Sequence, residues 1–169
     1  MTWDIQILAN QLHIDFFPKN EVLSAFIQQV NPSNYAILIG RVSKQLSFGS
    51  EFSSAIFFED LDFEDKDYLF NKTGGIKNGE IWIHQEVFGD TTIEFNLFIK
   101  ILYDYGNRLI EIYENSIEID SYYIKTLEIC KKKQEINLEE KKLFSELKMN
   151  WFKDMKQGLE NLRQILTMF

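Results

Sequence analysis

The last third of the chain holds the pattern that most restricts what it can fold into. From position 138 onward, apolar residues recur at spacings of three and four, the period of one face of an α-helix. The stripe consists of Leu147, Trp151, Met155, Leu159, Leu162, Leu166 and Phe169. Asn137, with Glu140 three residues later, has the form of a helix N-cap. We therefore predict a terminal helix of about 30 residues, about 45 Å long, with a bend at Gly158.

So long a helix needs an apolar surface along its stripe. One arrangement packs it on the preceding helix, predicted at about 121–135, as a C-terminal helical hairpin within the chain. The alternative is a homodimer formed through the C-terminal helix. We expect packing within the chain, because buried helix faces usually belong to a core.

The middle of the chain changes to the pattern of β-strands. Three short segments, 35–42, 54–59 and 79–88, are rich in β-branched and aromatic residues. Turn formers such as Gly49-Ser50 and Asn78-Gly79 bound them. The pattern predicts an α+β fold in a single domain over residues 1–169, with a small antiparallel sheet of about three to five strands in the first two-thirds, packed with helices.

Helices are predicted on both sides of this sheet. Residues 20–30 have helical apolar spacing, with Asn20 as the N-cap. A longer helix is predicted from Thr91, which would form a capping box with Glu94, and residues 110–120 suit either its end or a hairpin. The N-terminal segment 2–12 fits a helix or a strand, and we favour the helix.

The charge distribution restricts the partners of the chain. The formal net charge is −8, and residues 1–120 contain 19 acidic and 8 basic residues. A region this acidic repels nucleic acid, because proteins bind nucleic acid through Lys and Arg. The same negative charge attracts a basic protein. No apolar run reaches the roughly 18 residues of a membrane span, and the N-terminus lacks the features of a secretory signal. With Cys130 as the only cysteine, we expect a cytoplasmic protein that binds neither membranes nor nucleic acid.

The most unusual stretch is FFEDLDFEDKDYLF, residues 57–70, in which carboxylates alternate with aromatic rings. In a protein interface, rings supply contact area, and carboxylates steer the encounter and pair with Lys or Arg. The predicted partner-binding residues are Glu59, Asp60, Asp62, Phe63, Glu64, Asp65, Asp67 and Tyr68, with Phe70 as a further anchor. The alternative is a solvated acidic loop that leaves the sheet and returns to it.

Metal chemistry fits this stretch poorly. A calcium loop that starts at Asp60 would need glycine at its sixth position and glutamate at its twelfth, where the chain has Asp65 and Asn71. Glu64 and Lys66 match the Glu-x-Lys arrangement of one metal-dependent nuclease superfamily, but a substrate phosphate would face several uncompensated carboxylates. We therefore predict no metal site and no cofactor.

Other candidate catalytic groups are few. His13 and His84 each have a carboxylate two residues later, Asp15 and Glu86, and on a strand each pair would share a face. We interpret both histidines as packing residues, and the alternative function is a small metal-dependent hydrolase that uses His84, Glu86 and nearby carboxylates. Cys130 fits a buried helix face, and the chain has no nucleophile elbow and no phosphate-binding glycine loop. We predict a binding protein without catalytic residues.

In layout and composition, residues 35–115 resemble the immunity proteins of bacterial polymorphic-toxin and contact-dependent growth inhibition systems, notably in the strand, turn and helix pattern of WIHQEVFGDTTIEFNLFIKILYDY. The resemblance implies a protein that neutralises one cognate toxin, often a basic nuclease, by covering its active site or a nearby surface. The sequence thus predicts a non-enzymatic binding protein for a basic toxin domain, with a homodimeric adaptor as a further alternative.

Overall fold

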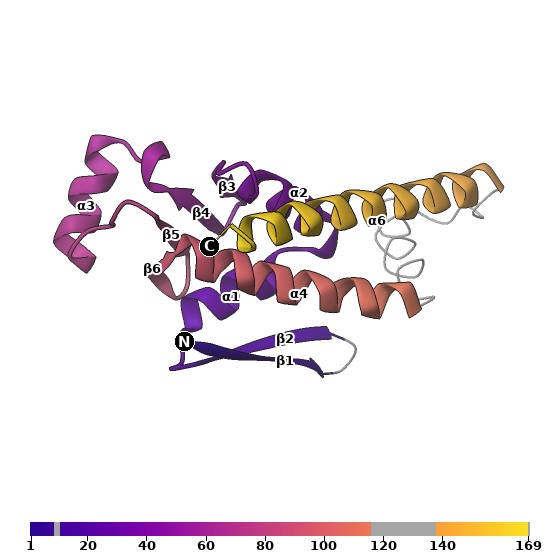
Figure 1. Ribbon diagram of the computed structural model, residues 1–169, viewed down its shortest axis with the longest axis horizontal. Coiled ribbons are helices and arrows are strands. Elements are labelled where there is room, and N and C mark those ends of the chain that lie inside the picture. Colours follow the sequence, from indigo (N-terminus) through magenta and orange to yellow (C-terminus); the bar gives the residue numbers. More distant parts are fainter. Residues whose placement is uncertain (9–10, 116–137, 169) are drawn as a thin grey trace.

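The computed structural model describes residues 1–8, 11–115 and 138–168, and it confirms the predicted α+β fold with a long last helix (Figure 1). A two-stranded antiparallel sheet is formed by β1 (Thr2–Leu8) and β2 (Gln11–Phe17). A four-stranded antiparallel sheet has the order β3 (Phe48–Gly49), β4 (Ser53–Phe57), β5 (Glu80–Gln85), β6 (Gly89–Glu94). The helices of the described residues are α1 (Glu21–Gln29), α2 (Pro32–Val42), η1 (Phe58–Asp60, a 3₁₀ helix), α3 (Phe63–Thr73), α4 (Phe95–Asn115) and α6 (Leu138–Leu166).

Several local predictions are confirmed within this architecture. The strands predicted at 54–59 and 79–88 are present as β4 and β5, which end two and three residues earlier than predicted. The helix predicted at 20–30 is α1, and the Asn20 side chain caps it by accepting a hydrogen bond of 3.0 Å from the backbone N–H of Leu23.

The N-terminal segment is a strand, so the helix predicted there is wrong. Apolar residues occupy every second position of β1, at Trp3, Ile5 and Ile7. Their antiparallel partners on β2 are Phe16, Ile14 and Leu12, all buried. Alternation on both strands gives the hairpin one apolar face, which a helix over the same residues would have divided.

Residues 35–42 belong to helix α2, so the strand predicted there is also wrong. Tyr35, Leu38, Ile39 and Val42 are fully buried and lie at helical spacing. Pro32 occupies the first helical position, where the missing N–H costs no hydrogen bond. The β-branched residues favour a strand locally, but tertiary packing of one helical face outweighs that propensity.

The predicted capping box at Thr91 is wrong as well, because α4 begins only at Phe95. Thr91 and Thr92 lie on β6, where they pair with Ile83 and Trp82 of β5. The helix itself is confirmed, and it extends to Asn115. The helix predicted at about 121–135 and the hairpin considered after Asn115 fall outside the described residues.

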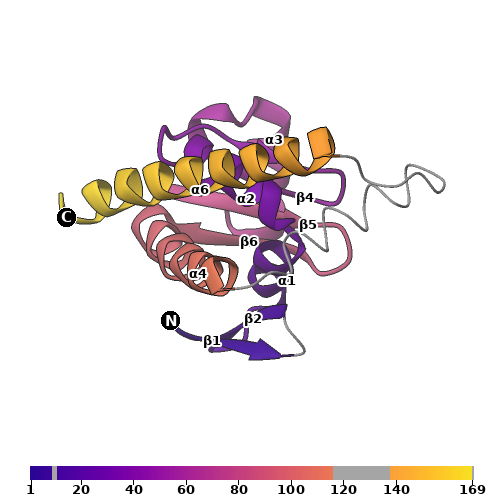
Figure 2. The same cartoon turned by 90° about the vertical axis from the view of Figure 1, so that its right-hand side faces the viewer.

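The four-stranded sheet separates a large apolar core from a small one, with α1 and α4 on one side and α3 on the other (Figure 2). Phe57, Ile81 and Ile83 face the large core, which also contains side chains of α1, α2, α4 and α6. Ile56 and Trp82 face the other way, because successive strand residues point to opposite sides. There they pack with Leu61, Leu69 and Ile76.

The stripe of α6 is largely covered within the chain. Met155, Leu159 and Leu162 are buried in the large core, and the indole N–H of Trp151 donates to the carbonyl of Pro32 at 2.7 Å. Gly158, where a bend is predicted, is buried where α6 meets α2. The predicted packing within the chain is thus confirmed for this part of the helix, with α2 and α4 as its partners.

Candidate functional site

The acidic stretch 57–70 leaves the sheet between β4 and β5 and is helical over most of its length. Asp62 is the N-cap of α3, and its side chain accepts a hydrogen bond of 2.8 Å from the backbone N–H of Asp65. Glu64 and Asp65 in the first turn favour the helix through its dipole. Gly74 ends the helix in the left-handed conformation, with φ of 82°. The stretch is thus a capped helix and not the solvated loop considered from sequence.

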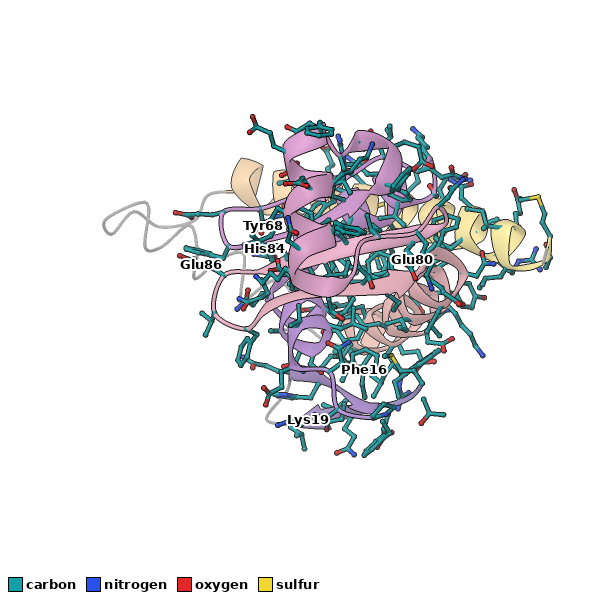
Figure 3. All side chains as sticks on the ribbon, turned by 90° about the vertical axis from the view of Figure 1, so that its left-hand side faces the viewer. Phe16, Lys19, Tyr68, Glu80, His84 and Glu86 are labelled. Atoms are coloured by element: carbon teal, nitrogen blue, oxygen red, sulfur yellow. The ribbon has the colours of Figure 1, made fainter. Side chains whose placement is uncertain are left out.

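Two phenylalanine rings mark the outward side of α3. Phe63, Asp67 and Phe70 lie at positions i, i+4 and i+7, which places them along one side of the helix. Phe63 is 84% exposed and Phe70 is 67% exposed, whereas Leu69 is completely buried against the sheet. Figure 3 shows α3 standing in front of the sheet. We call the predicted partner-binding residues together with Phe70 the acidic-aromatic surface.

The carboxylates of this surface are open to solvent. Five of them are exposed and Asp65 is half-buried. Asp60 accepts hydrogen bonds from the backbone N–H and the hydroxyl of Ser47, at 3.2 and 2.5 Å. No lysine or arginine of the described residues forms an ion pair with any of the six. Lys66, the base within the stretch, lies over the ring of Phe58 at 4.6 Å.

Tyr68 differs from the other rings of the surface because its hydroxyl is engaged under the helix. It accepts a hydrogen bond of 2.6 Å from Lys72 and lies 3.5 Å from a carboxylate oxygen of Asp90. Its ring packs on Trp82 of β5. Tyr68 is 48% exposed, so it contributes a ring edge to the surface while it also connects α3 to the sheet.

Asp90, at the start of β6, is the centre of a polar cluster between α3 and the sheet. Its side chain is only 1% exposed. It accepts hydrogen bonds from His84 Nδ1 at 2.6 Å and from Trp82 Nε1 at 3.1 Å, and it forms an ion pair with Lys72. Burial acts to raise the pKa of Asp90, but the hydrogen bonds from Lys72, His84 and Trp82 and the charge of Lys72 outweigh it, so the pKa is lowered. The hydrogen bonds of Lys72 to Asp90 and to Tyr68, together with the charge of Asp90, raise the pKa of Lys72.

Sequence patterns missed Asp90 and predicted a different neighbour for His84. β5 ends at Gln85, so His84 and Glu86 do not share a strand face, and His84 pairs with Asp90 across the β5–β6 hairpin instead. The signal that could have revealed this pair is hairpin register, since Gly89 opens the second strand and places Asp90 opposite His84.

The remaining catalytic candidates form no site in the part of the chain that the structure describes. His13 and Asp15 lie on β2, and no hydrogen bond joins them. Within residues 1–8, 11–115 and 138–168, no group of three or more His, Cys, Asp or Glu side chains is arranged to hold a metal ion. Cys130 falls outside these residues. None of the described helices is long and apolar enough to cross a membrane.

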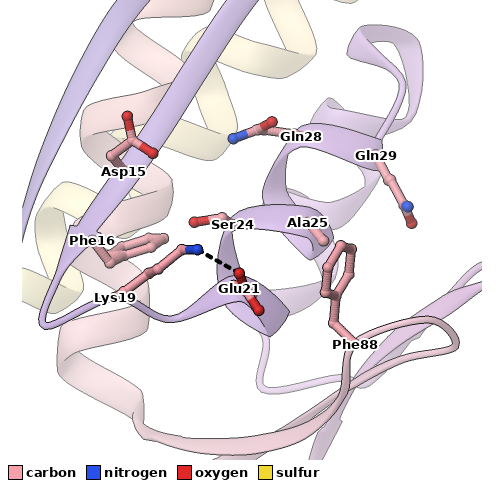
Figure 4. Close-up of a pocket in the computed structure, with 9 residues that line it drawn as sticks. All are labelled: Asp15, Phe16, Lys19, Glu21, Ser24, Ala25, Gln28, Gln29 and Phe88. Carbon is pink, nitrogen blue, oxygen red and sulfur yellow. Dashed lines mark hydrogen bonds and ion pairs between the residues drawn. The ribbon is translucent and has the colours of Figure 1, made fainter.

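A hollow of about 350 Å³ lies between β2, α1 and the β5–β6 turn (Figure 4). Lys19 and Glu21 line it and form an ion pair of 2.5 Å. Phe88 closes one side, and the buried Gln85 holds this turn by accepting from the backbone N–H groups of Val87 and Phe88. Lys19 and Glu21 are paired with each other and the hollow is open to solvent, so its lining residues do not converge on a reactive centre.

Comparison with known proteins identifies no relative: no family model matches the chain, and no curated protein or solved structure is significantly similar to it.

Proposed function

We propose that this protein is a non-enzymatic binding protein that captures a basic protein partner through the acidic-aromatic surface, in the way that an immunity protein neutralises a toxin domain. The observation that carries the proposal is the outward side of α3. There Phe63 and Phe70 are largely exposed, and the carboxylates around them have no cation of the described residues as an ion-pair partner.

The two residue types would have different roles in binding. Exposed aromatic rings gain most when a partner removes them from water, and such rings dominate interface energetics. Carboxylates raise the association rate by attracting a cationic surface, and they pair with Lys or Arg in the complex. Because no ion pair within the described chain has to break first, the carboxylates of α3 meet only the cost of their own desolvation.

The surface is also held in place before binding. Asp62 caps the helix, Leu69 anchors it in the small core, and Lys72 and Tyr68 connect it to Asp90. A surface that is ordered in the free protein loses less conformational entropy when the partner binds. This supports recognition by a fixed helix face.

The structure indicates which carboxylates to reverse in a test. Asp62 caps the helix and Asp60 bonds to Ser47, so changing either would disturb the fold. Glu64 and Asp67 are exposed and accept no hydrogen bond that supports another element. Glu146 and Asp154 on α6 are exposed acids far along the chain, and reversing them changes the net charge equally.

The test combines Glu64→Lys with Asp67→Lys and compares this variant with Glu146→Lys combined with Asp154→Lys. The probe is the protein encoded by the gene adjacent to that of this protein, and affinity is measured by isothermal titration calorimetry at about 50 and about 300 mM NaCl. We expect the α3 variant to weaken binding about 100-fold and to reduce the salt dependence, since each reversal replaces attraction by repulsion. Equal losses in both variants, or no binding by the wild-type protein, would refute the proposal.

A further inference from the structure

β1 has one strand neighbour and one open edge. It belongs to a two-stranded sheet in which β2 is its only strand neighbour among the described residues. Figures 1 and 2 both show β1 at the outside of the molecule, with β2 between it and α1. One face of β1 also contacts α4, where the indole N–H of Trp3 donates to Asp104 at 3.2 Å. α3 lies on the opposite side of the molecule in Figure 2, so this edge is separate from the acidic-aromatic surface.

The direction in which the N–H and C=O groups of β1 point can be inferred from the hydrogen bonds on the outer edge of β2. The carbonyl of Ile14 accepts from Gln28 Nε2 at 3.1 Å, and that of Leu12 accepts from the Tyr105 hydroxyl at 3.4 Å. These β2 carbonyls therefore face away from β1. Along two antiparallel strands, hydrogen-bonded and non-hydrogen-bonded residue pairs alternate. The β1 partners of Ile14 and Leu12 are Ile5 and Ile7, so the N–H and C=O groups of Ile5 and Ile7 point to the open edge.

Trp3 shares this orientation, because it lies two residues before Ile5 and pairs with Phe16 in the same alternation. No backbone group of the described residues bonds to this edge. An open strand edge is normally protected by charged side chains, lysine above all, by proline or by a bulge. Asp4 is the one charged residue of β1, which contains neither proline nor lysine, and its seven residues pair with β2 in unbroken register.

We propose that β1 pairs edge to edge with β1 of a second copy of this chain, antiparallel and around a twofold axis at Ile5. In this register Ile5 lies opposite Ile5 of the second copy, and Trp3 lies opposite Ile7 of the second copy. Each of these pairs exchanges two backbone hydrogen bonds. The two hairpins together form one four-stranded sheet.

Side-chain charge favours this register over its neighbours. The Gln6 amide donates to Asp4 of its own chain at 2.6 Å. In the dimer Asp4 lies opposite Gln6 of the second copy, whose amide has a second N–H that can donate to this carboxylate. Shifting the register by one bonded pair in one direction places Asp4 opposite Asp4 of the second copy, and like charges directly opposite each other are destabilising. The shift in the other direction places Asp4 opposite the apolar Leu8 of the second copy. The edge is therefore complementary to itself in one register.

The test depends on Asp4 of one copy lying opposite Gln6 of the other, and it uses the whole chain of 169 residues. Gln6→Glu would place two carboxylates opposite each other twice in the dimer, and Asp4→Lys combined with Gln6→Glu would restore attraction. Gln11→Glu makes the same chemical change on β2, away from the axis. The mass of each variant is measured by analytical ultracentrifugation from about 1 to about 500 μM, where mass action shifts the monomer–dimer equilibrium.

We expect the wild-type protein and the Gln11→Glu variant to dimerise alike. The Gln6→Glu variant should raise the dissociation constant about tenfold, and the double variant should return it to within about threefold of wild type. All four proteins should unfold at similar temperatures, because the three substituted positions are exposed. A wild-type protein that stays monomeric, or a dimer that Gln6→Glu leaves unchanged, would overturn the proposal.

Discussion

Asp90 is the residue on which the polar contacts beneath α3 converge. Its carboxylate is almost completely removed from solvent and accepts from two strand side chains, Trp82 and His84, and from two side chains of α3, Lys72 and Tyr68. A buried charge persists in a fold only when donors surround it. The contacts to His84 and Trp82 hold the sheet side of the cluster, and the ion pair with Lys72 adds the helix side.

We predict that Asp90→Asn lowers the free energy of unfolding by about 2 kcal/mol at pH 7, because the charge-assisted hydrogen bonds are lost. The lowered pKa of Asp90 means that its contribution is fully present above the unfolded-state value of about 3.9. It is lost as the pH falls through the lower pKa of the folded state. Urea unfolding at pH 7 and at about pH 3 should therefore show a smaller difference between variant and wild type at the lower pH.

Asp154→Asn is the matched control, since Asp154 is exposed on α6 and its side chain makes no hydrogen bond or ion pair with any residue that the structure describes. It should change stability by less than about 0.5 kcal/mol at either pH. If the Asp90→Asn variant were as stable as this control at pH 7, the cluster would contribute nothing to the attachment of α3.

Among the helices, the close contact of α6 with α2 depends on the absence of a side chain at Gly158. A Cβ atom at Gly158 would lie 2.9 Å from Cγ2 of Ile39, a fully buried residue whose branched side chain has little rotamer freedom. We predict that Gly158→Ala lowers stability by about 1–2 kcal/mol through overpacking. This is opposite to the gain of about 1 kcal/mol that alanine gives in an unhindered helix.

Gly40 on α2 supplies the comparison, because a Cβ atom there would have no neighbour within 4 Å. Gly40→Ala should raise the free energy of unfolding by up to about 1 kcal/mol. Thermal and urea unfolding of both variants measure the two effects. Changes of the same sign at the two positions would show that close packing does not decide the choice of glycine at position 158.

Elements whose sequence pattern agrees with their final contacts could be predicted, and the others could not. β5 was predictable because its β-branched and aromatic residues between turn formers suit a strand that is buried on both faces. α6 was predictable because its apolar spacing of three and four matches its burial. α2 and β6 were not, since Ile and Val in the first and the Thr91–Glu94 spacing in the second favour the wrong local structure. Their true form depends on packing and strand pairing with distant residues.

The same distinction applies to the candidate site. All residues of the acidic-aromatic surface lie in one stretch of the sequence, so the surface could be proposed from sequence alone. The attachment of α3 to the sheet depends on Asp90 and Trp82, which lie on β6 and β5. Composition contains no information about those partners until the strand register is known.

At the scale of the whole molecule, the four-stranded sheet divides the protein into regions of unequal stability. The large core joins the sheet to α1, α2, α4 and α6, whereas α3 is held by the small core of Leu61, Leu69, Trp82, Ile56 and Ile76. Local opening costs less where few apolar contacts must break. We therefore expect α3 to open without unfolding the rest of the chain.

Leu69→Ala tests this division, because Leu69 is fully buried in the small core. Removing its side chain should cost about 2–5 kcal/mol, and most of that cost should appear as local opening of α3. Hydrogen exchange should become about 30-fold or more faster in residues 63–73, while exchange in α4 changes little. Leu102→Ala, at an equally buried position of the large core, should instead accelerate exchange throughout the protein. Uniform acceleration by Leu69→Ala would show that the sheet transmits the loss and that the two cores unfold as one.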